Sequence, residues 1–211
     1  MKISLDLSAT GLKFTRPDIL QHPNIPKYLS GVNPRTLMGK EWWDRHRKQV
    51  YEVNNYHCFA CGVSSSNAKY HQWLEAHECY DYLWDKLVLR YRETVALCYT
   101  CHNFIHSGRL YNLYLDRKVA KDKIQFILMH GLVLLYGQGL KPDQKVIYIA
   151  SRLGGQAQKY ITKNKIKANT PSVLHAVDLL EPGWRMQFEG RLYNTLGMEV
   201  TEDEGQSSGS T

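Results

Sequence analysis

Two pairs of cysteines constrain the fold of this chain more than any other feature of its sequence. Cys58 and Cys61 form one Cys-x-x-Cys pair, Cys98 and Cys101 form the second, and 36 residues lie between the pairs. Each pair can present two thiolates from a tight turn, and two such turns complete a tetrahedral zinc site. A site closed by four sulfur ligands is structural, since no position is left for a substrate. We therefore expect a structural Zn²⁺ here, and the competing interpretation is two unrelated, reduced cysteine pairs.

The bulk composition indicates a soluble protein of the cytoplasm. Hydrophobic residues make up 43% of the chain and charged residues 22%, which is ordinary for a globular protein. The most apolar segment, 124–137, is too short to span a bilayer, and the N-terminus lacks the apolar stretch of a secretory signal. Cytosolic chains rarely keep disulfides, which also favours metal binding by the paired cysteines. We expect an intracellular protein without a membrane partner, with a phage or a prokaryote as one possible source.

Four regions are predicted along the chain, and their elements indicate an α+β fold. Residues 1–39, rich in Pro, Asn and Gly, predict an irregular arm, and residues 40–110 hold both cysteine pairs. Residues 111–200 are expected to be basic and mostly helical, with short strands at their end, and residues 201–211 to form a disordered tail.

Hydrophobic periodicity places the individual elements. A helix is expected to end near Asn55, followed by a hairpin within 71–98 that turns at 84–85. Cys79 falls in the first strand, and we expect a small buried residue there. The remaining predicted helices begin at 99, with an end near Gly108, and cover about 121–136 and 142–160.

Two histidines follow the second cysteine pair at helical spacing. His102 and His106 are four residues apart, so on a helix they share one face and can bind one ion together. The competing interpretation is a pair of core or capping histidines. A third histidine, His77, lies in the middle of the first predicted hairpin strand, within the run LEAHECY.

The order of these motifs resembles the HNH (ββα-metal) endonuclease family. CFACG, LEAHE and LCYTCHNFIH follow one another across about residues 42–110, as a strand–strand–helix unit bracketed by Cys-x-x-Cys turns. The resemblance implies hydrolysis of phosphodiester bonds, with DNA as the expected substrate. It places a catalytic divalent cation (Mg²⁺, Mn²⁺, Ni²⁺ or Zn²⁺) on His77, His102 and His106, and the structural zinc on the four cysteines.

Two positions depart from the family pattern. Many members carry Asp-His or His-His on the strand, the first residue binding metal and the second acting as the base, whereas this chain has Ala76-His77-Glu78. In one register His77 is the base and Ala76 has lost the ligand. In the other His77 is the ligand and Glu78 takes the place of the base; three histidines around one ion, as in colicin-like members, favour this second register. Glu93 stands where the family has the Asn that orients the base.

The alternative to an enzyme is a non-catalytic module, binding nucleic acid or protein, on an HNH scaffold. Ala76 and Glu93 are the residues that favour it. A third hypothesis is a zinc-stabilised structural protein without a nucleic-acid role. The basic middle region of the chain argues against this hypothesis.

Charge is unevenly distributed along the chain. The net charge is +7, and residues 109–167 hold 12 Lys and Arg against 3 Asp. A basic region of this kind suits a polyanion such as nucleic acid, although a solvated helical surface gives the same count. The region after 110 is also a candidate interface for a homodimer or a protein partner. The residues expected to contact a phosphate backbone are Arg109, Lys118, Lys121 and Lys123.

Overall fold

The computed structural model describes residues 15–22, 24–169 and 179–201. The chain divides into two compact units, each assembled from separate stretches of sequence. Unit 1 comprises 1–22, 50–77 and 95–170, and unit 2 comprises 23–49, 78–94 and 171–211. Each unit thus draws on the predicted regions 1–39, 40–110 and 111–200. The predicted tail lies outside the described residues except for Thr201.

The predicted α+β class is confirmed by helices and a mixed sheet within the described ranges. The helices are α1 (Pro34–Val53), α2 (Tyr99–Ile105), α3 (Ser107–Leu115), α4 (Lys121–Gly137), α5 (Gln144–Leu153) and α6 (Gly155–Asn164). The strands are β1 (Leu74–Leu83), β2 (Val88–Cys98), β3 (Arg185–Phe188), β4 (Arg191–Tyr193) and β5 (Glu199–Val200). No helix in these ranges is both long and apolar enough to cross a membrane.

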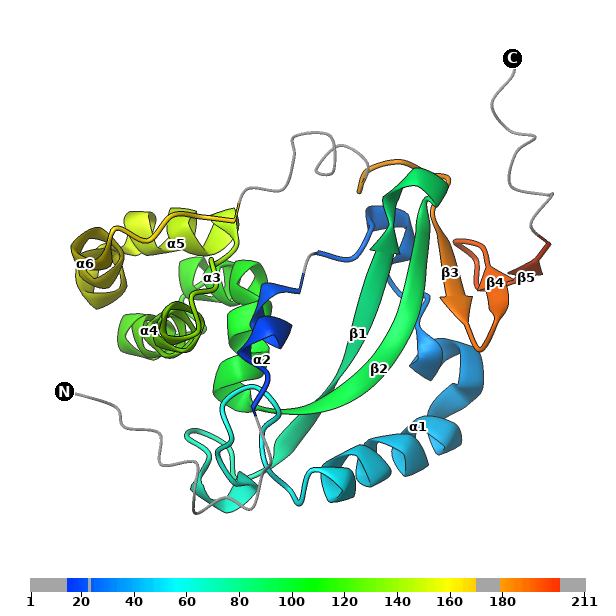
Figure 1. Ribbon diagram of the computed structural model, residues 1–211, viewed down its shortest axis with the longest axis horizontal. Coiled ribbons are helices and arrows are strands. Elements are labelled where there is room, and N and C mark those ends of the chain that lie inside the picture. The colour runs from blue at the N-terminus through cyan, green and yellow to red at the C-terminus, as the bar shows by residue number, and fades with distance from the viewer. Residues whose placement is uncertain (1–14, 23, 170–178, 202–211) are drawn as a thin grey trace. The chain divides into compact units, whose positions relative to one another are not determined.

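The sheet is built on the predicted hairpin. A short 3₁₀ turn at Trp84–Lys86 and Leu87 in the left-handed region (φ 48°) connect β1 to β2. The strand order is β1-β2-β3-β4-β5 (Figure 1). β3 pairs in parallel with β2, Leu89 opposite Met186, whereas β4 and β5 add antiparallel neighbours. Each hairpin strand is divided between the two units: β1 passes from unit 1 to unit 2 after residue 77, and β2 passes from unit 2 to unit 1 after residue 94.

A cluster of large apolar side chains forms the core of unit 2. Trp184, Leu89 and Met186 are at most 1% exposed and pack with Leu29 and Tyr80. Burial of each such side chain contributes roughly 1.5–3 kcal/mol. This core fixes the end of the hairpin that lies in unit 2.

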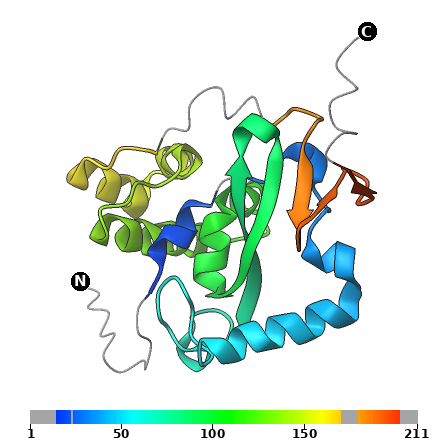
Figure 2. The ribbon, with the colours of Figure 1, turned by 45° about the vertical axis from the view of Figure 1, so that its right-hand side comes forward.

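Unit 1 is organised around α4. This helix is apolar on most of its surface, as expected for a buried helix, and Ile124, Ile127 and Leu128 are fully buried. The helices α2, α3, α5 and α6 all pack against it or against one another (Figures 1 and 2). Gly131 allows α2 to approach closely, because a Cβ there would overlap the ring of Phe104. The packing of α2 on α4 therefore fixes the helix that carries Cys101 and His102.

Two predicted helix boundaries were wrong. The helix that begins at 99 ends at Ile105, and Gly108 lies inside α3. The segment expected to be one helix over 142–160 is two, because Gly154 and Gly155 both adopt positive φ (62° and 77°). Such backbone ends a right-handed helix, and glycine is the residue that tolerates it.

Candidate metal centres

The first cysteine pair lies in a tight turn after α1. The N–H of Gly62 (φ 75°) donates to the carbonyl of Cys58 at 2.8 Å, and the N–H of Cys58 donates to the carbonyl of Val63 at 2.9 Å. The N–H of Phe59 donates to the carbonyl of Ala96 in β2 at 2.9 Å. These bonds hold the turn against the end of β2, where the second pair begins.

The second pair lies where β2 passes into α2. Cys98 ends the strand, and Cys101 lies in the first turn of the helix. The side chains of Cys58, Cys61, Cys98 and Cys101, the cysteine cluster, are 0–2% exposed, and their sulfur atoms lie within 4.8 Å of one another. The Sγ atoms of Cys61 and Cys98 are 3.8 Å apart. Zn–S bonds of about 2.3 Å in a tetrahedron give a sulfur spacing of about 3.8 Å, so the cluster fits a structural zinc.

Neighbouring thiols perturb one another's proton affinity in this cluster. Burial raises the pKa of Cys58, but hydrogen bonds with the other three thiols outweigh burial and hold the pKa well below its usual value. Hydrogen bonding with Cys58 and burial together raise the pKa of Cys101. The Nε2 atom of His130 lies 3.4 Å from the sulfur of Cys101, where a ring N–H can donate to a metal-bound thiolate.

The histidines expected to bind a catalytic cation also come together. His77 comes from β1, His102 from α2, and His106 from the junction of α2 and α3. Their ligand nitrogens lie within 4.8 Å of one another, and we call this group the histidine cluster. Its ring centroids are 4.8–5.4 Å apart. His77 is 5% exposed, and its Nε2 has no hydrogen-bond partner among the described residues.

A buried nitrogen without a partner costs free energy, and a metal ion would satisfy it. Burial lowers the pKa of His77 well below its usual value, with a further contribution from His22, His102 and His106. Burial, His102, Lys145 and Arg109 lower the pKa of His106 to about 4. Uncharged imidazoles are the form that coordinates metal ions.

Glu75 holds one histidine of this cluster and was not identified from the sequence. The Nδ1–H of His102 donates to the Glu75 carboxylate, whose other oxygen lies 4.0 Å from Nδ1 of His71. Burial raises the pKa of Glu75, but the hydrogen bond with His102 and the charges of His102 and His71 together outweigh burial, and the pKa is lowered. A carboxylate on the second nitrogen of a metal-binding histidine fixes its ring and raises its basicity. Glu75 is two residues before His77, so strand periodicity could have placed both on one face.

Two further histidines adjoin the clusters without a local sequence signal. The ring of His22 lies edge-on to that of His77, with centroids 5.3 Å apart. His130, on α4, contacts the cysteine cluster as described above. Both come from segments distant in sequence, so only the packing of unit 1 identifies them.

Glu78, the other residue expected to act in catalysis, is not part of the histidine cluster. It follows His77 on β1, and successive strand residues point to opposite faces. Its charge contributes to the raised pKa of Tyr80 and of Tyr91, after burial. The assignment of Glu78 as a base stays a prediction.

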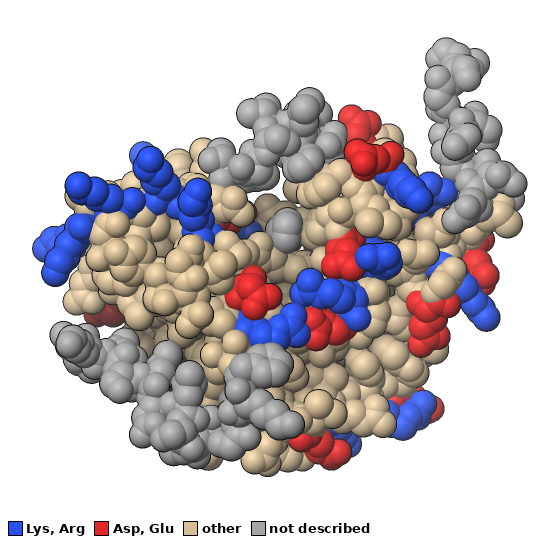
Figure 3. All heavy atoms as spheres, in the orientation of Figure 1, with Lys and Arg blue, Asp and Glu red and all other residues tan. Residues whose placement is uncertain are grey.

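The residues expected to contact phosphate separate into two sets. Lys121 and Lys123 line one groove of unit 1, whereas Arg109 lies on α3, and Lys118 forms an exposed ion pair with Asp116 at 3.5 Å. Additional basic side chains gather over α5 and α6, where Figure 3 shows several lysines and arginines together. Residues 144–169 contain six Lys and Arg and no Asp or Glu.

Comparisons with protein-family models, with curated proteins and with solved structures found no match to this chain. No relative therefore supplies a role for either cluster. The assignment of both centres rests on their residues and geometry, which are described above.

Proposed function

We propose that this chain is a metal-dependent HNH-type endonuclease that hydrolyses phosphodiester bonds, with DNA as its substrate. The observation that carries the proposal is the histidine cluster: three imidazoles from β1, α2 and the α2–α3 junction, one with a buried nitrogen that has no hydrogen-bond partner among the described residues. The histidine cluster adjoins the cysteine cluster, because His102 directly follows Cys101 on α2. The order of strand, helix and Cys-x-x-Cys turns along the sequence carries the family resemblance, and the adjacency of the two clusters supports the proposal.

The donor sets of the two clusters differ in the chemistry they permit. Four thiolates close the coordination sphere of zinc, whereas three imidazoles leave positions open for water and substrate. An ion held there would stabilise negative charge on the phosphate oxygens. Imidazole ligands suit Zn²⁺ or Ni²⁺, while Mg²⁺ prefers carboxylate and water oxygen, so the cluster favours a transition ion.

The chain's own residues would divide the remaining tasks. His77, His102 and His106 would bind the ion, and Glu75 would orient His102 through its hydrogen bond. With His77 as a ligand, the resemblance gives Glu78 the role of accepting the proton of the attacking water. That role requires β1 to bend, because Glu78 points to the opposite face of the strand from His77. The basic residues of α5 and α6 supply positive potential for a polyanionic substrate.

Cleavage of supercoiled plasmid tests the proposal. Wild type and His102→Ala are compared with Zn²⁺, Ni²⁺, Mn²⁺, Mg²⁺ or no added metal, after zinc content has shown that the cysteine cluster of both proteins is intact. We expect metal-dependent nicking by wild type, stronger with Ni²⁺ than with Mg²⁺, and its loss in His102→Ala. Equal nicking by both proteins, or none by wild type with any metal, contradicts the proposal.

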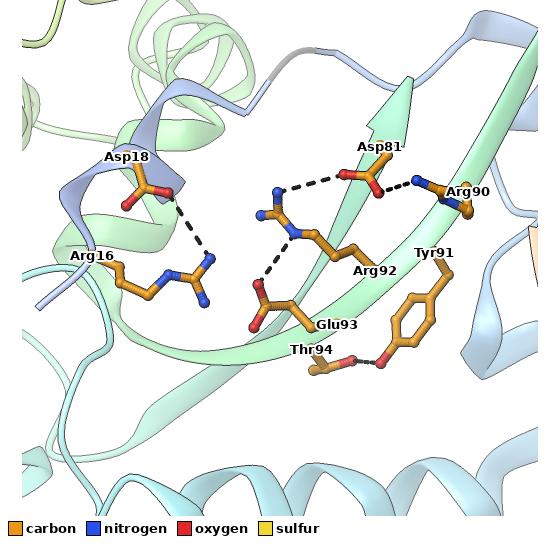
Figure 4. A network of polar contacts seen from close by, with 8 residues as sticks. All are labelled: Arg16, Asp18, Asp81, Arg90, Tyr91, Arg92, Glu93 and Thr94. Carbon is orange, nitrogen blue, oxygen red and sulfur yellow. Dashed lines mark hydrogen bonds and ion pairs between the residues drawn. The ribbon is translucent and has the colours of Figure 1, made fainter. Parts of the chain in front are cut away.

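One observation favours the second candidate, a non-catalytic nucleic-acid-binding module. Glu93, at the position of the family's base-orienting Asn, lies 3.2 Å from Nε of Arg92. Arg92 and Arg90 both pair with Asp81, at 3.6 and 2.9 Å (Figure 4). Glu93 is thus part of a charge network on the sheet. This candidate predicts DNA binding without cleavage in the plasmid experiment.

A further inference from the structure

A groove of about 620 Å³ in unit 1 combines lysines with aromatic rings. Its lining includes Lys69 and Tyr70 from the loop before β1, and Lys121, Lys123 and Phe126 from the first turns of α4. None of these residues belongs to either metal centre. Its volume lies within the usual range of about 300–1,000 Å³ for small-ligand sites, so it would hold roughly one nucleotide and not a duplex.

The groove carries a surplus of positive charge that carboxylates do not neutralise. Three lysines line it against one acidic residue, Asp122, which leaves a surplus of two charges. Among the described residues, none of the three lysines forms an ion pair with a carboxylate. Instead the ammonium of Lys69 lies 3.6 Å from the ring centroid of Phe126, and that of Lys123 lies 4.7 Å from that of Tyr70. Such ammonium groups can turn to an anion without breaking a salt bridge.

The start of α4 adds backbone donors on the same side. The first N–H groups of a helix have no partner within it and attract anions. The N-cap residue, Ala120, has no side chain that could satisfy them. The first residue of the 17-residue helix is Lys121, a lining residue of the groove. The groove is therefore lined by lysine side chains and includes the first turn of α4, whose amides attract anions.

The aromatic side chains supply ring faces beside these donors. Tyr70 is 38% exposed, and its ring meets that of Phe126 edge-on, with centroids 5.8 Å apart. The backbone of Tyr70 has φ 76°, which is unusual for a bulky residue and holds its ring at the groove. Phe126 is half-buried, and its ring face becomes available when the Lys69 ammonium turns to a phosphate. An exposed aromatic face next to a cationic groove is how proteins stack the bases of single strands.

We propose that this groove binds one phosphate and the adjoining unpaired base of a single-stranded nucleic acid. The proposal rests on the proposed function and narrows its substrate to nucleic acid with a single-stranded segment. Bases in a duplex are stacked on one another and cannot offer their faces to Tyr70 or Phe126. Lys69, Lys121 and Lys123 bind the phosphate in this arrangement.

Fluorescence anisotropy with a labelled oligothymidylate tests the groove without any cleavage. Zinc-loaded protein is titrated, with no other divalent metal, against the oligonucleotide and against a duplex of equal length. Lys123→Gln is compared with Lys86→Gln, which changes an exposed lysine of unit 2 outside the groove. Tyr70→Ala and Phe126→Leu each remove one aromatic ring from the groove. If Tyr70→Ala fails to fold, Phe126→Leu tests the contribution of the rings.

We expect tighter binding of the single strand than of the duplex, and about tenfold weaker binding after loss of a ring face. Log K falls with log salt, and Lys123→Gln should make this slope less steep by about 0.7. Lys86→Gln should leave the slope unchanged. Equal affinity for the two nucleic acids, or unchanged binding in folded ring variants, overturns the proposal. Binding without plasmid cleavage would refute the nuclease alone, and cleavage with groove-independent binding would refute the groove alone.

Discussion

Replacing Gly131 by alanine should disturb the contact that positions α2 against α4. A Cβ at this position would lie closer than 3.0 Å to three carbons of the Phe104 ring. Phe104 is 1% exposed, so its ring is enclosed by protein and does not face solvent. Because Phe104 lies on α2 between Cys101 and His106, its displacement would shift both the cysteine cluster and the histidine cluster.

The magnitude follows from two opposing contributions. Overpacking a core by one carbon costs about 1–3 kcal/mol. Alanine in place of a helical glycine gains about 0.5–1 kcal/mol. Since the overlap involves the ring itself, we expect a net loss of about 2 kcal/mol, or roughly 4–8 °C in Tm for a protein of this size.

Gly108→Ala is the matched control. Gly108 is also helical, in α3, and a Cβ there would meet no atom of the described residues within 4 Å. This variant should gain the helical contribution alone, about 0.5–1 kcal/mol. Thermal unfolding of the zinc-loaded proteins, followed by circular dichroism, measures both. If Gly131→Ala is as stable as Gly108→Ala, the described packing of α2 on α4 is wrong.

Three further predictions address the metal centres and the core of unit 2. Cys58→Ser should lose bound zinc in metal analysis, whereas Cys79→Ser, at a buried cysteine outside the cluster, should retain it; equal zinc contents would refute the four-sulfur site. Glu75→Gln should weaken Ni²⁺ binding at the histidine cluster by about 10–100-fold in calorimetric titration, because the orienting carboxylate of His102 is lost; an unchanged affinity would exclude that role. Burial and the nearby charge of Glu78 raise the pKa of Tyr80 above 10.0 in the folded protein. The folded protein therefore keeps the Tyr80 phenol neutral at a pH at which the unfolded chain ionises it, and the full contribution to stability is present below about pH 10. This contribution is lost as pH rises above about 10. Urea unfolding should therefore show a smaller loss of stability between pH 9 and 11 in Tyr80→Phe than in wild type, and equal losses would count against the assignment.

Features with a local signal were predicted from the sequence. The cysteine cluster could be inferred because each Cys-x-x-Cys pair forms its own turn, and the pairing of two such turns is common in zinc sites. The hairpin followed from alternation, and the shared face of His102 and His106 from their spacing on a helix. The pair Gly154-Gly155 was a visible break signal that the helix prediction over 142–160 did not use.

Features that depend on distant segments were not predicted. The parallel pairing of β3 with β2 joins Met186 to Leu89, and no local pattern specifies that register. His130 reaches Cys101 only because α4 packs against α2. The groove likewise needs the loop at Lys69 next to the start of α4, so the sequence indicated basic residues there without their aromatic partners.

We propose that the histidine cluster forms a second, exchangeable metal site beside the zinc site of the cysteine cluster. Native mass spectrometry of zinc-loaded protein in excess Ni²⁺, before and after brief chelation, tests it most directly. We predict two ions in wild type, of which the zinc survives chelation, and one ion, the zinc, in His102→Ala. A single ion in wild type, or two ions in His102→Ala, would contradict a second metal site at the histidine cluster.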